Sequence, residues 1–213
     1  MIPAISRIFV SMSIAEKLPH FTVEQYLELE LKAEYQSEYF DGEIYAMSGG
    51  SPTHSFIINN VGASMHNRLL DRNCRVANQS LKVWAKEENS FMYPDIMVIC
   101  GPITLAPNTK DAIINPMVVF EVLSPSTSAF DRGGKFRKYK SLPSLKEYVL
   151  IEQDEPEIDV FERLPNGDWN LRSYSGLETE IQLNSLGLSV PMKEIYAKID
   201  FPTDLNIPGV FPA

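Results

Sequence analysis

The chain has 213 residues, of which 44% are hydrophobic and 22% charged, with a formal net charge of −9. This length suits one domain with a sizeable core. The absence of an apolar run of about 18 residues argues against a membrane-spanning helix. The negative charge argues against broad non-specific binding of nucleic acid, although it permits a local basic patch and suits a site that collects cations.

The two ends of the sequence are expected to lie outside the folded part. The opening stretch, MIPAISRIFVSMSIAEK, has no basic leader and contains charged residues, so we do not expect a signal peptide. Residues 1–20 are expected to form an extension without fixed structure, and Met1 and Met12 are both candidate starts. Residues 201–213 form a Pro-rich tail. A single domain over residues 21–200 is therefore predicted.

The sequence has two cysteines, Cys74 and Cys100. They are too few for a disulfide scaffold and lack the spacing of metal ligands. We therefore expect both thiols to be reduced and the protein to be cytoplasmic.

The first elements are a helix and a hairpin. Residues 21–35 carry a capping-box signal at Thr22 and Gln25 and an apolar stripe, which predicts a helix. The stretch SEYFDGEIYAMS alternates around Asp41-Gly42, a strong signal for a tight β-hairpin. This places Glu38 on the first strand of the hairpin.

The rest of the chain alternates between helical and strand patterns. Helices are predicted over residues 53–72 and 128–141, with a short one in PMKEIYAKI, and strands over 75–86, 90–100, 116–124 and in EYVLIE, EIDVFER and WNLRSYS. This order predicts an α/β (α+β) fold in which helices flank a central mixed sheet.

Two predicted apolar strands each carry a single acidic residue. Because side chains alternate along a strand, Asp95 shares a face with Met97 and Ile99, and Glu121 shares one with Val119 and Leu123. If these strands are neighbours, two carboxylates meet. A hard divalent ion bound by oxygen ligands would then relieve their repulsion.

The spacing alone leaves a structural explanation open. Asp95 follows Pro94 and fits a strand-end acid, and Glu121 could form a buried ion pair with Arg137 or Lys138 of the next helix. A carboxylate-pair glycosidase is a further alternative, but it would give the basic helix no role.

Motifs along the chain bear a family resemblance. The stretch MYPDIMVI, followed by VVFEVLSPSTSAFDRGGKFRKYKSLPSLKEYVLIE, resembles the Uma-type restriction endonucleases of bacteria, a branch of the PD-(D/E)XK nuclease superfamily. The upstream SEYFDGEIYAMSGGSPTHS resembles the same family, so the likeness covers about residues 22–165. It implies a restriction-endonuclease-like core.

The resemblance also implies roles for individual residues. Asp95 and Glu121 become the metal-binding acids of the two motifs. The superfamily lysine two positions after the second acid is replaced here by Leu123, which implies that Lys135 on the following helix takes its place, with Lys138 as the other candidate.

Two earlier residues also match the family. Glu38 resembles the N-terminal acid that many superfamily members bring to the metal. His54 matches the histidine of the family and could contact a phosphate or a water at the metal. Exposure of Glu38 and a local hydrogen bond of His54 are the structural alternatives.

The resulting hypothesis is a DNA endonuclease that hydrolyses phosphodiester bonds with Mg²⁺, for which Mn²⁺ can substitute. A homodimer is expected, because two sites related by a two-fold axis match the symmetry of duplex DNA. The alternative is an inactive nuclease-like module that binds nucleic acid or protein.

Overall fold

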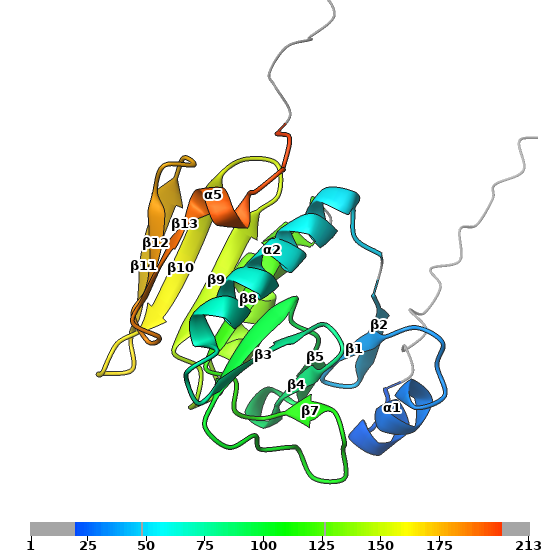
Figure 1. Cartoon of the computed structure of the whole chain (residues 1–213). Helices are drawn as coiled ribbons and strands as arrows, with labels where there is room; N and C mark the ends of the chain where they lie inside the picture. Colours follow the sequence, from blue (N-terminus) through cyan, green and yellow to red (C-terminus); the bar gives the residue numbers. More distant parts are fainter. Residues whose placement is uncertain (1–19, 48, 126, 202–213) are drawn as a thin grey trace, which may run out of the picture.

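The computed structural model describes residues 20–47, 49–125 and 127–201. Apart from His20 and Phe201, the predicted extension and tail lie outside these residues. Every helix in the described part is too short or too polar to cross a bilayer. The described part contains two larger β-sheets, a two-stranded sheet, and helices that pack against them (Figure 1).

The larger sheet has six strands in the order β11-β10-β9-β8-β6-β3. Its strands are β3 (Cys74–Asn78), β6 (Ile96–Cys100), β8 (Val118–Leu123), β9 (Glu147–Glu152), β10 (Glu157–Arg163) and β11 (Trp169–Ser175). Strands β8 and β9 are parallel, whereas the other neighbours are antiparallel. The predicted mixed sheet is thus confirmed.

The smaller sheet has five strands in the order β2-β1-β5-β4-β7. They are β1 (Ser37–Phe40), β2 (Glu43–Ala46), β4 (Lys82–Ala85), β5 (Ser90–Met92) and β7 (Ala112–Ile113), and a 3₁₀ turn, η1 (Lys86–Glu88), connects β4 to β5. The helix α1 (Val23–Glu30) packs Tyr26 against Tyr39 and Phe91 of this sheet. The predicted capping box of Thr22 and Gln25 is present at its start.

One face of the larger sheet is covered by α2 (Pro52–Leu69) (Figure 1). Ser51 caps this helix by accepting a hydrogen bond from the His54 amide. Its buried residues recur every fourth position, as predicted, at Ile57, Val61, Met65 and Leu69. The hairpin of β12 (Glu180–Leu183) and β13 (Leu188–Pro191) and the short helix α5 (Met192–Ile195) complete this layer.

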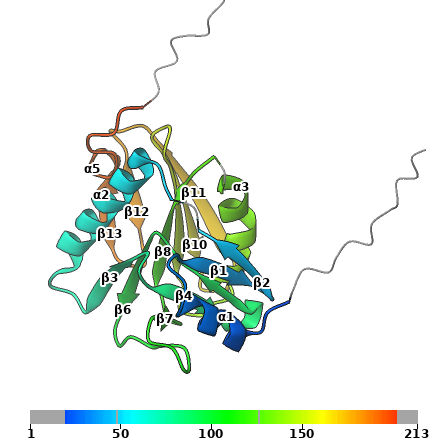
Figure 2. The same ribbon diagram turned by 90° about the vertical axis from the view of Figure 1, so that its right-hand side faces the viewer.

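On the opposite side of the larger sheet, α3 (Ser128–Phe130), the π-helical turn η2 (Asp131–Lys135) and α4 (Phe136–Tyr139) follow one another (Figure 2). The sequence predicted one regular helix here, and the π turn is a correction. The residues Met97, Ile99, Val119 and Leu123 face this layer and share a core with Tyr139. Their neighbours on β6 and β8 face α2 instead, which confirms the predicted alternation.

Two predicted strands are each divided between the two sheets. Residues 75–86 separate into β3 and β4, and residues 90–100 separate into β5 and β6. The second division falls at Tyr93-Pro94-Asp95, where proline cannot donate a ladder hydrogen bond. The chain therefore passes from the smaller sheet to the larger one immediately before the Asp95 carboxylate.

The cysteine prediction is wrong in this structure, because Cys74 and Cys100 form a disulfide. The two residues lie directly opposite each other on the antiparallel strands β3 and β6. Their spacing of 26 residues gave no signal for this pairing, which depends on strand register alone.

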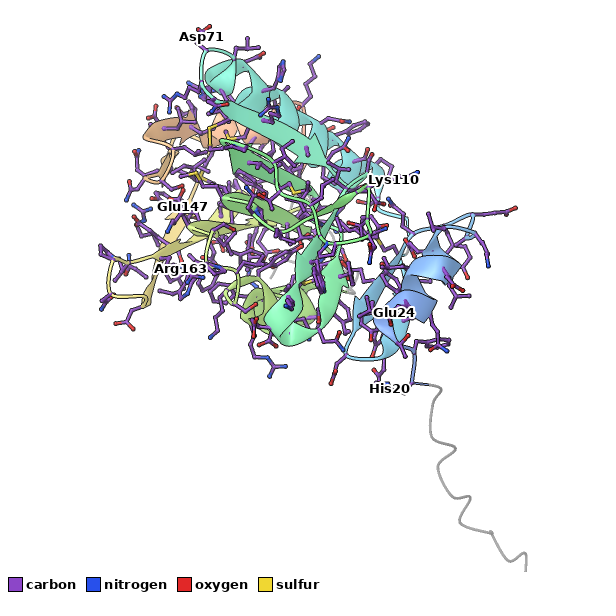
Figure 3. All side chains as sticks on the ribbon, turned by 90° about the horizontal axis from the view of Figure 1, so that it is seen from below. His20, Glu24, Asp71, Lys110, Glu147 and Arg163 are labelled. Atoms are coloured by element: carbon purple, nitrogen blue, oxygen red, sulfur yellow. A yellow bond between two sulfur atoms is a disulfide. The ribbon has the colours of Figure 1, made fainter. Side chains whose placement is uncertain are left out.

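The predicted Asp41-Gly42 turn joins β1 to β2. Both residues have positive φ, 45° and 96°. His20 lies at the start of the described chain (Figure 3), and its ring is 2.3 Å from where a Cβ on Gly42 would stand. Replacing Gly42 with Ala is expected to lower the free energy of unfolding by about 1–2 kcal/mol, the cost of left-handed backbone for a residue with a side chain. Urea denaturation would measure the change.

Gly49→Ala is the matched control for that experiment. Gly49 has no positive φ, and nothing lies within 4 Å of its Cβ position. Its urea midpoint should stay at the parent value. A Gly42→Ala variant with the same midpoint as Gly49→Ala would show that the turn is not strained by a side chain.

Candidate active site

A cleft of ≈ 920 Å³ gathers the predicted site residues. Its walls come from β1 and β2 of the smaller sheet, from β8 of the larger sheet, and from the segment that holds α3, η2 and α4. The charged side chains and the histidine that line it are Glu38, His54, Asp95, Glu121, Asp131, Lys135, Arg137 and Lys138. All five residues singled out from the sequence therefore share one cavity.

Asp95 and Glu121 lie side by side because of strand register. Ile96 pairs with Phe120 on β6 and β8, and the two acids are the next residues beyond that pair. The Asp95 amide lies 3.4 Å from Glu121 Oε2, and the Val122 amide donates to Asp95 Oδ2 at 2.7 Å. Both acids are almost fully buried. The predicted meeting of two carboxylates is thus present.

Lys135 reaches these acids from the π turn. Its Nζ lies 3.0 Å from Glu121 Oε1, 3.1 Å from Glu38 Oε1 and 3.8 Å from Asp131 Oδ1. Lys138, the other candidate, instead places its Nζ over the ring of Phe40. The lysine among the carboxylates is therefore Lys135.

Glu38 comes to the cleft from β1, on the other sheet. Besides Lys135, its Oε1 accepts a hydrogen bond from the Tyr93 amide at 2.9 Å. Glu38 is thus held at the cleft rather than exposed on the hairpin. Its carboxylate contacts the Lys135 ammonium and the Tyr93 amide, and its predicted role as a metal ligand stays a prediction.

His54 lies in the first turn of α2 and points into the cleft. Its Nε2 is 3.0 Å from the Val122 carbonyl oxygen and 3.4 Å from Asp95 Oδ2. Both of these atoms are acceptors, so Nε2 carries a proton. Burial lowers the pKa of His54, but the Asp95 carboxylate more than offsets this, and the pKa lies above its usual value.

The comparisons with known proteins identify the family of the chain. The family Uma2, described as "Putative restriction endonuclease", matches residues 23–193, most of the chain. The chain belongs to the Uma2 family.

Relatives of this Uma2 chain occur in Synechocystis sp. (strain ATCC 27184 / PCC 6803 / Kazusa). The uncharacterized protein slr1290 is 36% identical over 192 residues, which cover 90% of this chain and all of that protein. The uncharacterized protein sll1609 is 31% identical over 163 residues, or 76% of this chain and 92% of that protein.

A solved structure shares the fold of this Uma2 chain. The crystal structure of "a putative nuclease belonging to DUF820" from Anabaena variabilis ATCC 29413 superposes with a TM-score of 0.69 at 20% identity. The likeness covers 83% of this chain and 97% of that one. It confirms the predicted fold class.

The charges of the Uma2 cleft are unevenly balanced. Burial raises the pKa of Glu121 well above its usual value; Lys135 opposes this rise, and Asp95 adds to it. Burial also raises the pKa of Asp131. Burial disfavours the Lys135 ammonium, but Glu121 and the other neighbouring carboxylates outweigh it and hold its pKa well above normal. Lys135 therefore stays cationic, and one ammonium is shared among several acids.

This imbalance predicts a stability effect. Because the folded-state pKa of Glu121 is raised, its ionisation destabilises the fold as pH rises from the usual 4.5 through the raised value. Glu121→Gln removes that ionisation. In metal-free buffer at pH 8 the Tm of Glu121→Gln is expected to exceed that of the parent, by about 2–4 °C for each kcal/mol of destabilisation that the substitution removes. The difference in Tm should disappear toward pH 4. Thermal melts across this range would measure it.

Glu194→Gln is a control for which the opposite change in Tm is expected. A hydrogen bond from Arg68 lowers the pKa of Glu194, so its ionised form stabilises the fold above the usual pKa. Its replacement should lower Tm slightly at pH 8, because the side chain is 41% exposed and screened. A Glu121→Gln variant that melts below the parent at pH 8 would contradict the assignment of charge strain to the cleft.

Sequence reasoning missed two residues that hold the acids in place. Gln79, in the turn between β3 and β4, donates from Nε2 to Asp95 Oδ1 at 2.8 Å. Tyr93 donates its amide to Glu38. Neither belongs to a periodic pattern, and a polar residue in a turn gives no sign of a distant partner. Tyr139 also contacts the site, since it donates its hydroxyl to Glu121 at 3.1 Å.

Proposed function

We propose that this Uma2 protein is a divalent-metal-dependent DNA endonuclease that hydrolyses phosphodiester bonds. The observation that carries the proposal is the convergence of Asp95, Glu121 and Lys135 in one cleft, from segments distant in the sequence. Two adjoining carboxylates beside a cation are the groups that metal-assisted phosphodiester hydrolysis requires. Membership of a family described as restriction endonucleases supports the same reaction.

The donors fit a hard cation such as Mg²⁺ or Mn²⁺. Asp95 and Glu121 supply adjacent carboxylate oxygens. Across residues 20–47, 49–125 and 127–201, no three His, Cys, Asp or Glu side chains are arranged to hold an ion by themselves. Mg²⁺ commonly takes only one or two protein carboxylates and completes its shell with water and substrate phosphate. We therefore assign Asp95 and Glu121 as the main ligands, with Glu38 as the third acid within the site.

The residues of the chain then have distinct tasks. A bound divalent ion would supply Lewis-acid chemistry, lowering the pKa of water and offsetting phosphate charge. The Lys135 ammonium donates hydrogen bonds to the attacking water or to the phosphoryl oxygens, where negative charge develops. Its position between Glu38 and Glu121 fixes the direction of those hydrogen bonds.

His54 and Gln79 orient the metal-binding acid. Gln79 fixes one oxygen of Asp95, and His54 approaches the other, as does the Val122 amide. Such partners set which lone pairs of a carboxylate remain for a ligand. His54 also lines the cleft, so it can reach a bound phosphate.

We also propose that the protein is a homodimer, which would allow it to cut both strands of its DNA substrate. A single cleft can attack one strand, and a two-fold pair of clefts would match the two strands of a duplex. Light scattering of the purified chain would measure its mass against 24.1 kDa for one copy.

The test is cleavage of supercoiled plasmid DNA with Mg²⁺, with Mn²⁺, or with a chelator. The parent is expected to nick or linearise the plasmid only when a divalent ion is present. Calorimetry with Mn²⁺ in the absence of DNA should show heat of binding that Glu121→Gln abolishes. No cleavage and no Mn²⁺ heat would instead indicate the alternative, a nuclease-like module that binds without cutting.

A further inference from the structure

Besides the buried Tyr93, three aromatic side chains line the same cleft as the catalytic carboxylates. They are Phe40 on β1, Tyr45 on β2 and Phe130 on α3. The Phe40 ring lies 5.5 Å from that of Tyr45 and 5.1 Å from that of Phe130. We call these three residues the aromatic rim. Tyr45 is 50% exposed and Phe130 40%, so two of its rings remain open to solvent.

The rim lies next to the acids because of hairpin register. Tyr45 is the cross-strand partner of Glu38, so both side chains lie on one face of the hairpin. Phe40 lies two residues after Glu38 and shares that face. The hairpin and α3 lie near each other in Figure 2, and the Phe130 ring packs against the Phe40 ring. A group bound at the carboxylates therefore has aromatic faces directly beside it.

The position of Phe130 depends on a glycine. A Cβ at Gly134 would stand 2.5 Å from the Phe130 ring, which lies over the π turn. Gly134 immediately precedes Lys135. The same turn thus directs both the lysine to the acids and the phenyl ring to the rim.

Cations flank the rim, but they are few. Lys138 places its Nζ 5.2 Å from the centre of the Phe40 ring, and Arg137 is exposed at the cleft wall. Among the described lining residues, three Lys or Arg side chains face four carboxyl groups. Phosphate attraction alone is therefore modest here, whereas base–aromatic stacking adds affinity without depending on charge.

We propose that the aromatic rim binds an unpaired nucleobase next to the phosphate held at the carboxylates, so that the preferred substrate is single-stranded or locally unpaired DNA. The inference rests on the proposed function and specifies its substrate class. A base inside a duplex has both faces covered by its neighbours, so its ring cannot stack on Tyr45 or Phe130. A base in an unpaired strand can.

Equilibrium binding without cleavage tests this. Fluorescence anisotropy would compare a labelled single-stranded 12-mer with its blunt duplex, using the full chain in chelator. The parent should bind the single strand more tightly. The Tyr45→Ala/Phe130→Ala double variant should lose about 10- to 100-fold in affinity for the single strand, in keeping with the loss of one or two stacked bases, and change little toward the duplex.

Abasic DNA distinguishes stacking from general contact. The parent would be tested on a set of 12-mers, each lacking one base. For one of them, its affinity should fall to the level that the double variant shows for the intact strand. The double variant should not distinguish that oligonucleotide from the intact one. Phe56→Ala and Tyr35→Ala are the matched controls, because these rings are 56% and 65% exposed and do not line the cleft. Both should bind like the parent.

Equal or tighter binding of the duplex by the parent would overturn the inference, as would an equal loss toward both DNAs in the double variant. Failure of the proposed function gives a different result. In that case base-dependent binding persists in chelator, but no DNA is cut when Mg²⁺ or Mn²⁺ is added. Conversely, the Tyr45→Ala/Phe130→Ala variant could keep metal-dependent cleavage of both single-stranded and duplex DNA. That result would refute the role of the aromatic rim and leave the proposed function standing.

Discussion

Asp95→Asn is expected to reduce the rate of metal-dependent DNA cleavage by at least about 10³-fold, or about 4 kcal/mol of transition-state stabilisation. Asparagine keeps the shape of the side chain and an acceptor for Gln79 or the Val122 amide, but it lacks the negative charge that a divalent ion requires. The measurement is the single-turnover rate on an end-labelled oligonucleotide in Mg²⁺. Circular dichroism should show an unchanged fold.

Asp159→Asn is the matched control for this change. Asp159 forms an ion pair with Arg132 and lies outside the cleft that holds Asp95. Its cleavage rate should stay within about threefold of the parent, a difference of less than 1 kcal/mol. If Asp95→Asn also cleaves within tenfold of the parent, Asp95 does not hold the metal.

Lys135→Met should lower kcat by about 10²–10³-fold, the usual cost of removing one donor aimed at developing charge. The same change leaves Glu38, Glu121 and Asp131 without their shared cation, so the metal-free variant should also melt earlier. Added Mn²⁺ should restore part of that stability, because the ion replaces a positive charge among the acids. Rates would therefore be compared in saturating metal, well below each variant's Tm.

Two other lysine variants make this result specific. Lys138→Met should raise KM more than it lowers kcat, because its ammonium lies over the Phe40 ring at the cleft wall. Lys146 is exposed and outside the cleft, so Lys146→Met should match the parent in both constants. A larger loss of kcat in Lys138→Met than in Lys135→Met would transfer the catalytic assignment to Lys138.

Much of the site could be inferred from the sequence because local patterns determine it. The two-residue alternation of a strand placed Asp95 and Glu121 on defined faces, and those faces are the ones observed. The Asp41-Gly42 pair fixed a hairpin whose register puts Glu38 toward the cleft. The position of Lys135, by contrast, came from family resemblance, since helical spacing alone did not separate it from Lys138.

What the sequence did not reveal depends on contacts between distant segments. The division of two strands between sheets, the Cys74–Cys100 disulfide and the hydrogen bond from Gln79 to Asp95 all follow from how strands are ordered in space. The π turn is another case. It places Lys135 against acids on two sheets. Helix propensity does not include the energy of these ion pairs, so it could not predict the turn.

The origin of these groups in two separate sheets bears on protein synthesis. Glu38 belongs to the smaller sheet, Glu121 to the larger one, and Lys135 to a segment that follows both acids in the sequence. A nascent chain leaving the ribosome would hold the early acids before the lysine had been translated. The charge cluster can form only once both sheets have docked, so under the proposed function an unfinished or half-folded polypeptide would be unable to cut DNA.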